Sequence, residues 1–277
     1  MPDTDAAPPT FPPPRHAITL LGADVELRTG TDLRGWMPVV PHVATASGAP
    51  SLAAMGMLLD IVGGTSAALA ARPDQVFTAD MSVHLLPSVV VDEVVCDVHV
   101  RRRGRRTLVQ EFSLEGGRGE PVGRGTTTFV VTRRSDDGPD VESHDFHGRQ
   151  PFWPLGPDEE PARYREELGL RIDGPGEVSI DARWQVANNV GALNGGVQAA
   201  MIDESATSLG RVHLAPTAEA TDAHIAFLRP GLKGPLRAVA TLVGGPAPEG
   251  DRLTAEVRLL DAEGTLCTFA TTEVVVP

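Results

Sequence analysis

The stretch Ser51-Leu-Ala-Ala-Met-Gly-Met-Leu-Leu-Asp60-Ile-Val decides the fold of this chain, because a second version of it follows 143 residues later. The second version is Gly195-Gly-Val-Gln-Ala-Ala-Met-Ile-Asp203-Glu204. Each stretch surrounds one carboxylate with apolar residues and predicts a buried helix. A threonine follows each Asp by eighteen residues and a proline by twenty-seven, as Thr78 with Thr221 and Pro87 with Pro230. A repeat of this length predicts a duplicated domain rather than a solenoid, whose units are a few tens of residues long.

Strand-like runs follow each predicted helix. They are rich in Val, Thr and Leu and are separated by Gly, Pro and charged turns, which is typical of antiparallel strands and hairpins. Each half is therefore expected to be one long helix followed by a four-stranded meander, with shorter strands before the helix. The expected strands are 77–86, 89–101, 107–114 and 123–131 in the first half and 221–228, 236–243, 253–260 and 266–276 in the second, preceded by 23–27 with 36–40 and by 177–186.

The chain is expected to divide into two domains of similar size. Residues 1–14 are acidic and proline-rich and predict a disordered tail. Residues 15–134 form the first predicted domain, 135–161 a linker rich in Gly, Pro and acidic residues, and 162–277 the second, which a short helix near 162–170 opens. The two units are expected to pair edge to edge into one continuous sheet, because unpaired edge strands favour aggregation. The predicted product is an α+β pseudo-dimer within one chain.

Composition excludes several classes of function. The 277 residues carry 24 Lys and Arg against 37 Asp and Glu, a net charge of −13, which argues against nucleic acid or an anionic membrane as the main partner. No uninterrupted apolar run reaches about 18 residues, and the N-terminus carries acid where a signal peptide needs base. We therefore expect a cytoplasmic protein. Cys96 and Cys267 have no CxxC or histidine pattern nearby, so both are predicted core residues and no metal is expected.

The carboxylate inside each apolar helix needs an explanation, because burying an isolated charge costs more than burying an apolar neighbour gains. Two interpretations of Asp60 and Asp203 remain open at this point. Each is either a structural residue that binds a backbone amide of the opposite half or an arginine, or a general base or nucleophile in a cleft between the halves.

The residues before Asp203 resemble a known family. Asn188-Asn-Val-Gly-Ala-Leu-Asn194-Gly195-Gly196 precedes Asp203, and HIAFLRP and a closing TxxVVV strand follow it. This resembles the PaaI-type acyl-CoA thioesterases of the hotdog superfamily, whose signature is an Asn, a His-Gly-Gly six residues later, and an Asp nine residues after that His. The spacings here are also six and nine, with Asn194 in place of the His. In the first half, Ser51-Leu52-Ala53 replaces the motif entirely.

The resemblance implies a double hotdog, in which each repeat has a long central helix wrapped by a bent antiparallel sheet. It also implies that the backbone N–H of Gly195 polarises the thioester carbonyl, with Gly196 beside it in the substrate site. The start of a helix suits this task, since its N–H groups lack helical acceptors and its dipole is positive.

The resemblance further implies that Asp acts as general base or nucleophile and that a hydroxyl eighteen residues on aligns it. The loop of one unit is expected to face the Asp of the other. Asn188, Asn194 and Gly195 would then complete a site with Asp60 and Thr78, while Asp203 and Thr221 would face the degenerate loop around Ser51 and Leu52. Asp60 is therefore the preferred working carboxylate, and Asp203 stays a candidate.

The arginine-rich turn and two histidines are further candidate features. The turn Arg101-Arg102-Arg103-Gly104-Arg105-Arg106 either grips the phosphates of coenzyme A, since arginine forks suit phosphate geometry, or is a solvated hairpin tip. His84 and His224 are not equivalent in the repeat and are expected to be core or edge histidines.

The implied function is an acyl-CoA thioesterase of fatty acid metabolism that releases free acid and CoA without a metal or redox cofactor. The alternatives are a non-catalytic acyl-CoA binding protein and a hotdog acyl-CoA dehydratase, whose Gly-Asp-x-Asn-Pro-x-His context is absent from the sequence. No GxSxG elbow, GxGxxG turn or P-loop occurs. A homo-oligomer of pseudo-dimers is compatible with the sequence.

Overall fold

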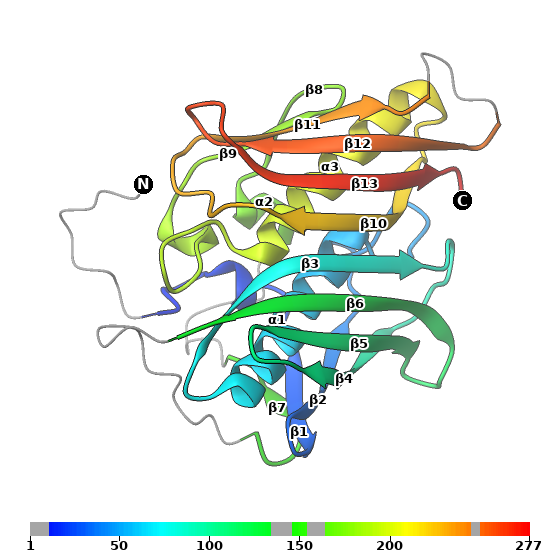
Figure 1. Ribbon diagram of the computed structural model, residues 1–277. Coiled ribbons are helices and arrows are strands. Elements are labelled where there is room, and N and C mark those ends of the chain that lie inside the picture. The colour runs from blue at the N-terminus through cyan, green and yellow to red at the C-terminus, as the bar shows by residue number, and fades with distance from the viewer. Residues whose placement is uncertain (1–10, 134–145, 154–163, 245–249) are drawn as a thin grey trace.

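The computed structural model describes residues 11–133, 146–153, 164–244 and 250–277 (Figure 1). Two long helices, α1 (Leu52–Ala71) and α3 (Gly195–His213), lie next to each other against one face of a single antiparallel sheet. The sheet has thirteen strands in the order β7-β1-β2-β4-β5-β6-β3-β10-β13-β12-β11-β9-β8. The α+β class and the continuous sheet through both halves are therefore confirmed.

The two halves contribute matching sets of elements. The first half comprises the 3-10 helix η1 (Ala17–Thr19), β1 (Asp24–Thr29), β2 (Asp32–Pro38), α1, β3 (Gln75–Leu85), β4 (Glu93–Arg103), β5 (Thr107–Gly116) and β6 (Pro121–Thr132). The short strand β7 (Gln150–Pro151) follows. The second half comprises α2 (Tyr164–Leu168), β8 (Arg171–Gly174), β9 (Glu177–Ile180), the 3-10 helix η2 (Trp184–Val186), α3, β10 (Glu219–Phe227), β11 (Leu236–Leu242), β12 (Arg252–Leu260) and β13 (Leu266–Val275).

The expected four-stranded meander is wrong in one respect. β4, β5 and β6 do form a meander, but β3 pairs with β6 rather than with β4, and β10 pairs with β13. β3 and β10 therefore lie at the inner edges of their halves, where they pair with each other. This order leaves neither inner edge unpaired, which stabilises the join between the halves.

The strand expected at 177–186 is also shorter than predicted. β9 ends at Ile180, and Trp184–Val186 form a 3-10 turn. The chain has to leave the sheet here, because residues 187–194 run across to the N-terminus of α3.

A side-chain cap starts each long helix. Ser51 Oγ accepts a hydrogen bond from the Ala54 N–H at 3.2 Å, and Asn194 Oδ1 accepts one from the Val197 N–H at 3.2 Å. Such caps satisfy one of the free N–H groups at a helix start. α1 is long and apolar enough by length and composition to cross a membrane, but most of it is buried inside the fold, as expected of the core helix of a domain.

The two helices touch at equivalent residues of the repeat. Gly56 and Ala199 are 143 positions apart, and a Cβ added to Gly56 would lie 2.5 Å from the Cβ of Ala199. The pseudo-twofold axis that relates the halves therefore passes close to this contact, and glycine at one of the two positions is what lets the helices approach so closely.

The histidines of the join differ from the prediction. His224 Nε2 lies 2.6 Å from Asp80 Oδ2, and His84 Nδ1 pairs with Asp222, in both cases across β3 and β10. Both imidazoles are more than half exposed. They are neither core nor edge residues, because their strands are central in the sheet and their side chains lie on its solvent face. Cys96 and Cys267 are buried, as predicted.

The segment between the halves is only partly described. β7 pairs with β1, Phe152 N–H donates to Ala23 O at 2.8 Å, and the ring of Phe152 stacks on Phe146. The predicted tail up to residue 10, and the parts of the predicted linker at 135–145 and 154–161, lie outside the described residues. The domain boundaries thus stay a prediction.

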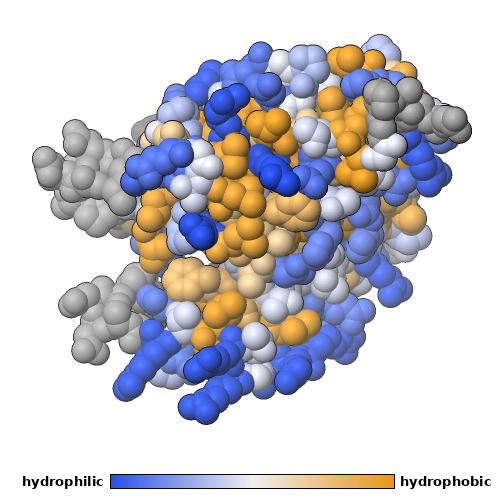
Figure 2. All heavy atoms as spheres, turned by 45° about the horizontal axis from the view of Figure 1, so that its top comes forward, coloured by the Kyte–Doolittle hydropathy of each residue, from blue (hydrophilic) through white to orange (hydrophobic). Residues whose placement is uncertain are grey.

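Both outer edges of the sheet are short strands. β7 has two residues and β8 has four, and short edges limit association with other sheets. Ile172 on β8 is 56% exposed. Seen from the side of the second half, the surface mixes hydrophobic and hydrophilic side chains (Figure 2).

Candidate active site

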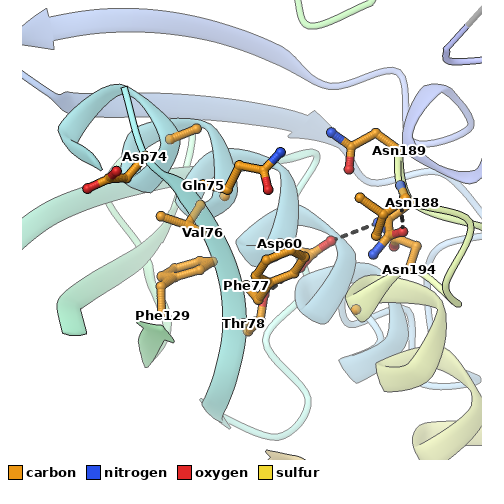
Figure 3. Close-up of a pocket in the computed structure, with 14 residues that line it drawn as sticks. Asp60, Asp74, Gln75, Val76, Phe77, Thr78, Phe129, Asn188, Asn189 and Asn194 are labelled. Atoms are coloured by element: carbon orange, nitrogen blue, oxygen red, sulfur yellow. Dashed lines mark hydrogen bonds between the residues drawn. The ribbon is translucent and has the colours of Figure 1, made fainter. Parts of the chain in front are cut away.

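Asp60 on α1 lies against the N-terminus of α3, so the site combines both halves of the chain (Figure 3). Its Oδ2 accepts a hydrogen bond from Asn194 Nδ2 at 2.9 Å, and the carboxylate also accepts one from the backbone N–H of Gly196. Thr78 Oγ1 on β3 lies 3.5 Å from Oδ1, at the limit of a hydrogen bond. The structure thus brings together the residues that the sequence grouped around Asp60.

Asn194 uses both ends of its side-chain amide. Its oxygen caps α3 by accepting from the Val197 N–H, while its nitrogen donates to Asp60. One residue therefore starts the helix and fixes the carboxylate that faces it. An Asn at this position can supply a donor, but unlike a His it cannot exchange a proton near neutral pH.

The glycine pair allows this close approach. A Cβ on Gly195 would lie 2.6 Å from Asp60 Oδ1, and a Cβ on Gly196 would lie 2.6 Å from Met57 Sδ. Larger residues at either position would push the start of α3 away from α1. Gly195 is the first residue of α3, so its N–H has no acceptor within the helix and lies at the positive end of the helix dipole.

The surroundings of Asp60 shift its acidity. Burial raises the pKa of the Asp60 carboxyl, and the Gly196 N–H, the Asn194 amide and the Thr78 hydroxyl offset part of that rise. A carboxylate with a raised pKa is a stronger base than an exposed one, which suits proton transfer near neutral pH.

A cavity of about 230 Å³ opens beside Asp60. Asparagines of the 188–194 loop lie on one side of Asp60 in Figure 3, and Val76 and Phe129 lie on the other. Asn188 itself organises the loop, since its Oδ1 accepts from the N–H groups of Val190 and Ala192 at 3.1 and 3.0 Å. The lining residues are Asp60, Gly64, Ala68, Asp74, Gln75, Val76, Phe77, Thr78, Phe129, Asn188, Asn189, Val190, Asn194 and Gly195.

Asp203 has a different environment, although it occupies the equivalent position. It is 3% exposed, and its Oδ2 accepts from the Ala53 N–H at 2.8 Å. Ala53 is the counterpart of Gly196 in the repeat. The hydroxyl that reaches Asp203 is Thr207, at 2.9 Å from Oδ1; among the described residues, the predicted partner Thr221 forms no hydrogen bond to it.

Side chains from α2 occupy the neighbourhood of Asp203. Arg165 Nη2 lies 3.9 Å from Asp203 Oδ2, and Arg165 Nε lies 2.8 Å from Glu204 Oε1. Burial raises the pKa of the Glu204 carboxyl, and the charge of Arg165 opposes that rise. Tyr164 is fully buried, with its hydroxyl 3.5 Å from Ala53 O. The structural interpretation of a buried Asp, paired with an arginine and a backbone amide, therefore fits Asp203.

The contacts of Asp203 were not predicted from the sequence. Tyr164 and Arg165 belong to a short charged helix whose position in space follows only from the tertiary fold, and Thr207 is one of several hydroxyl residues on α3. The available signal was the spacing of Asp203 and Thr207, since residues four apart on a helix share a face.

The arginine turn between β4 and β5 does not line the cavity. Arg101 pairs with Glu111 at 2.7 Å, and Arg103 Nε donates to Ala70 O, near the end of α1, at 3.2 Å. Arg102 and Arg105 are exposed. A role of these four arginines in binding the phosphates of CoA stays a prediction.

Comparison with known proteins identifies the fold. No protein-family model and no curated protein sequence matches the chain. Solved structures match it over most of its length. The 12:0-ACP thioesterase from Umbellularia californica has a TM-score of 0.59 and 14% identity, covering 88% of this chain and 94% of that one.

Two bacterial structures match similarly. An acyl-ACP thioesterase from Bacteroides thetaiotaomicron has a TM-score of 0.57 and 12% identity, covering 88% of this chain and 98% of that one. The acyl-CoA thioesterase II TesB2 from Mycobacterium marinum has a TM-score of 0.56 and 16% identity, covering 94% and 98%. At such identities the likeness shows the fold, and the expected double hotdog is confirmed. It does not distinguish the PaaI type from other types.

Proposed function

We propose that this protein hydrolyses an acyl-CoA thioester to a free acid and CoA at the Asp60 site. The observation that carries the proposal is a buried carboxylate with a raised pKa, held 2.9 Å from Asn194 at the start of α3 and lining a cavity. The similarity to structures named as acyl-ACP and acyl-CoA thioesterases, and the resemblance of residues 188–203 to the PaaI-type motif, support it.

In the proposed reaction, the thioester carbonyl oxygen accepts a hydrogen bond from the Gly195 N–H. A water molecule attacks the carbonyl carbon while Asp60 takes its proton, and the positive end of the α3 dipole stabilises the oxyanion. Collapse of this intermediate breaks the carbon–sulfur bond, and the leaving thiolate recovers the proton from Asp60. The net change consumes one water and yields one acid and one thiol.

A covalent route uses the same groups. Asp60 attacks the carbonyl carbon directly and CoA leaves as the thiolate; water then hydrolyses the resulting anhydride to the free acid and a protonated Asp60, which gives its proton to the thiolate. In either route Asn194 holds the carboxylate but exchanges no proton, because an amide does not titrate.

The test is release of free thiol from short, medium, long and aromatic acyl-CoAs by the wild type, Asp60→Asn and Asp203→Asn. We expect Asp60→Asn to lose about 10²–10⁴-fold in turnover, the usual contribution of a general base, and Asp203→Asn to keep it. Loss in Asp203→Asn alone would move the reaction to the other site. Tight binding of acyl-CoA by a wild type that releases no thiol would identify a non-catalytic binding protein instead.

A further inference from the structure

The cavity follows a stripe of small residues along α1. Asp60, Gly64 and Ala68 are spaced four residues apart, lie on one face of the helix, and all line the cavity. With a rise of 1.5 Å per residue, Ala68 lies about 12 Å along the helix from Asp60. A Cβ added to Gly64 would meet no atom within 4 Å, so the space above Gly64 is open.

The two ends of the cavity differ in polarity and exposure. Asn189 and Val190 are exposed, and the loop that carries them also presents the other asparagines. At the opposite end Phe129 is 2% exposed and packs with the half-buried Val76 (Figure 3), and the half-buried Asp74 and Gln75 line the same end. The asparagine end is therefore the more open one, and the opposite end is mainly apolar apart from Asp74 and Gln75.

This difference in polarity indicates which way the thioester substrate lies in the cavity. The thioester has to lie at Asp60 and Gly195, between the two ends. The arm of CoA carries amides and phosphates and suits the open end with its asparagine amides, whereas an acyl chain gains most from burial against Val76, Phe129 and Ala68.

Resting on the proposed function, we propose that the segment of the cavity from Gly64 to Phe129 binds an uncharged acyl group of short to medium length, and that Ala68 limits that length. The total volume of 230 Å³ is below the roughly 300 Å³ at which sites for drug-sized ligands begin. Asp74 lines the same end, so its carboxylate would repel an acyl group that ends in a second carboxylate.

The second half supports the role of the small residues. The positions 143 residues after Gly64 and Ala68 are Thr207 and Arg211, and Thr207 donates to Asp203. Larger polar side chains thus stand where the Asp60 side has open space. A larger residue in place of Gly64 or Ala68 would fill part of the open space beside Asp60, as Thr207 and Arg211 do in the second half.

The experiment compares kcat/KM for acetyl-, hexanoyl-, palmitoyl- and glutaryl-CoA between the wild type and Ala68→Leu. The control is Ala70→Leu, the same change at a residue of α1 that does not line the cavity. We expect the wild type to favour hexanoyl-CoA, and Ala68→Leu to lose about tenfold or more on it while acetyl-CoA changes little, since a single methylene in an apolar pocket is worth about 10–200-fold. Equal loss on all chain lengths, or a wild type that prefers palmitoyl- or glutaryl-CoA, would overturn the proposal.

A second experiment tests the reverse orientation, in which CoA enters at the apolar end of the cavity. Arg103 contacts the carbonyl of Ala70, so the arginine turn lies at the apolar end, and CoA entering there would place its phosphates near Arg102 and Arg105. We expect Arg102→Ser/Arg105→Ser to leave KM unchanged for both hexanoyl-CoA and hexanoyl-N-acetylcysteamine, a thioester without phosphates. A KM raised for the CoA ester alone would reverse the orientation and contradict the proposal.

Failure of the reaction and failure of this inference are distinguishable. If the wild type releases no thiol, equilibrium binding of the same acyl-CoAs to the wild type, Ala68→Leu and Ala70→Leu still decides the question. Weaker binding of hexanoyl-CoA, with acetyl-CoA unchanged, in Ala68→Leu alone would support the proposal, and identical binding by all three proteins would contradict it.

Discussion

The Asp60 and Asp203 sites share one backbone arrangement and differ in what surrounds it. In each, a carboxylate accepts the N–H of the second residue in the opposite helix, Gly196 for Asp60 and Ala53 for Asp203. Around Asp60 the neighbouring positions leave a cavity, whereas around Asp203 they hold Thr207 and an arginine from α2. The contact between a carboxylate and a helix start is thus common to both sites, and the open space beside Asp60 is what distinguishes the proposed reactive one.

Apart from changes to the carboxylates themselves, the largest effect is expected at Gly195, which lies against Asp60. Gly195→Ala would place a Cβ 2.6 Å from Asp60 Oδ1 and displace the proposed oxyanion donor. We expect turnover to fall by about 10²–10³-fold, as for loss of an oxyanion-hole donor, measured as kcat for thiol release. The counterpart is Leu52, and Leu52→Ala should cost about 2–5 kcal/mol in free energy of unfolding with turnover retained. Equal losses of turnover in Gly195→Ala and Leu52→Ala would contradict the proposed difference between the Asp60 and Asp203 sites.

Arg165 tests the difference between the two sites through the free energy of unfolding. Arg165→Met removes the cation next to Asp203 and Glu204, both of which are buried. We expect a loss of about 2 kcal/mol in free energy of unfolding, less than for a fully buried pair because the Arg165 side chain is 31% exposed. Urea denaturation measures this loss, and Arg165→Met/Glu204→Gln should recover part of it. A change in kcat of the same size would instead place Arg165 in the reaction.

The two helix caps form a matched pair. Ser51→Ala should cost about 1 kcal/mol in free energy of unfolding, the usual value for a lost N-cap, and Asn194→Ala should cost at least as much. Only Asn194→Ala also removes a hydrogen bond to Asp60, which as a bond to a charged group is worth about 1.5–3 kcal/mol. Thiol release should therefore fall about tenfold or more in Asn194→Ala alone. A similar fall in Ser51→Ala would show that the activity follows stability rather than this contact.

The smallest effect concerns pH. Folding raises the pKa of Asp60, so its contribution to stability is present below the ordinary pKa of an Asp and is lost as pH rises through the raised folded value. The stability of Asp60→Asn relative to the wild type should thus increase with pH, which denaturation at pH 5 and pH 8 measures. The kcat/KM of the wild type should rise with pH along an acid limb above pH 3.8. A stability difference that falls as pH rises would contradict the burial of a charged Asp60.

Local patterns predicted the elements well and their arrangement less well. The strand expected at 253–260 is observed at Arg252–Leu260, because alternating apolar residues are visible in the chain itself. The pairing of β3 with β6, by contrast, depends on residues that are about fifty positions apart, and no local pattern encodes it.

Part of the candidate site was also predictable from patterns that are visible in the sequence. The repeat of Asp60 in Asp203, together with the resemblance of the motif before Asp203 to the PaaI-type thioesterases, led us to group Asp60 with Asn194. The same repeat made the two halves look alike, so it could not reveal that α2 supplies Arg165 to one side, nor that Gly64 and Ala68 leave space on the other. Such differences depend on side-chain volume at single positions rather than on a pattern.

The contact between Gly56 and Ala199 has a consequence for assembly from separate copies. In a dimer of identical subunits, a residue on the symmetry axis must meet its own copy, so the choice is between two glycines and two alanines. Two alanines would bring Cβ atoms to 2.5 Å of each other, and two glycines would leave a gap and loosen both helices. Because both helices belong to one chain, the axis can hold one glycine and one alanine. The close packing of α1 on α3 therefore depends on the two halves having different sequences.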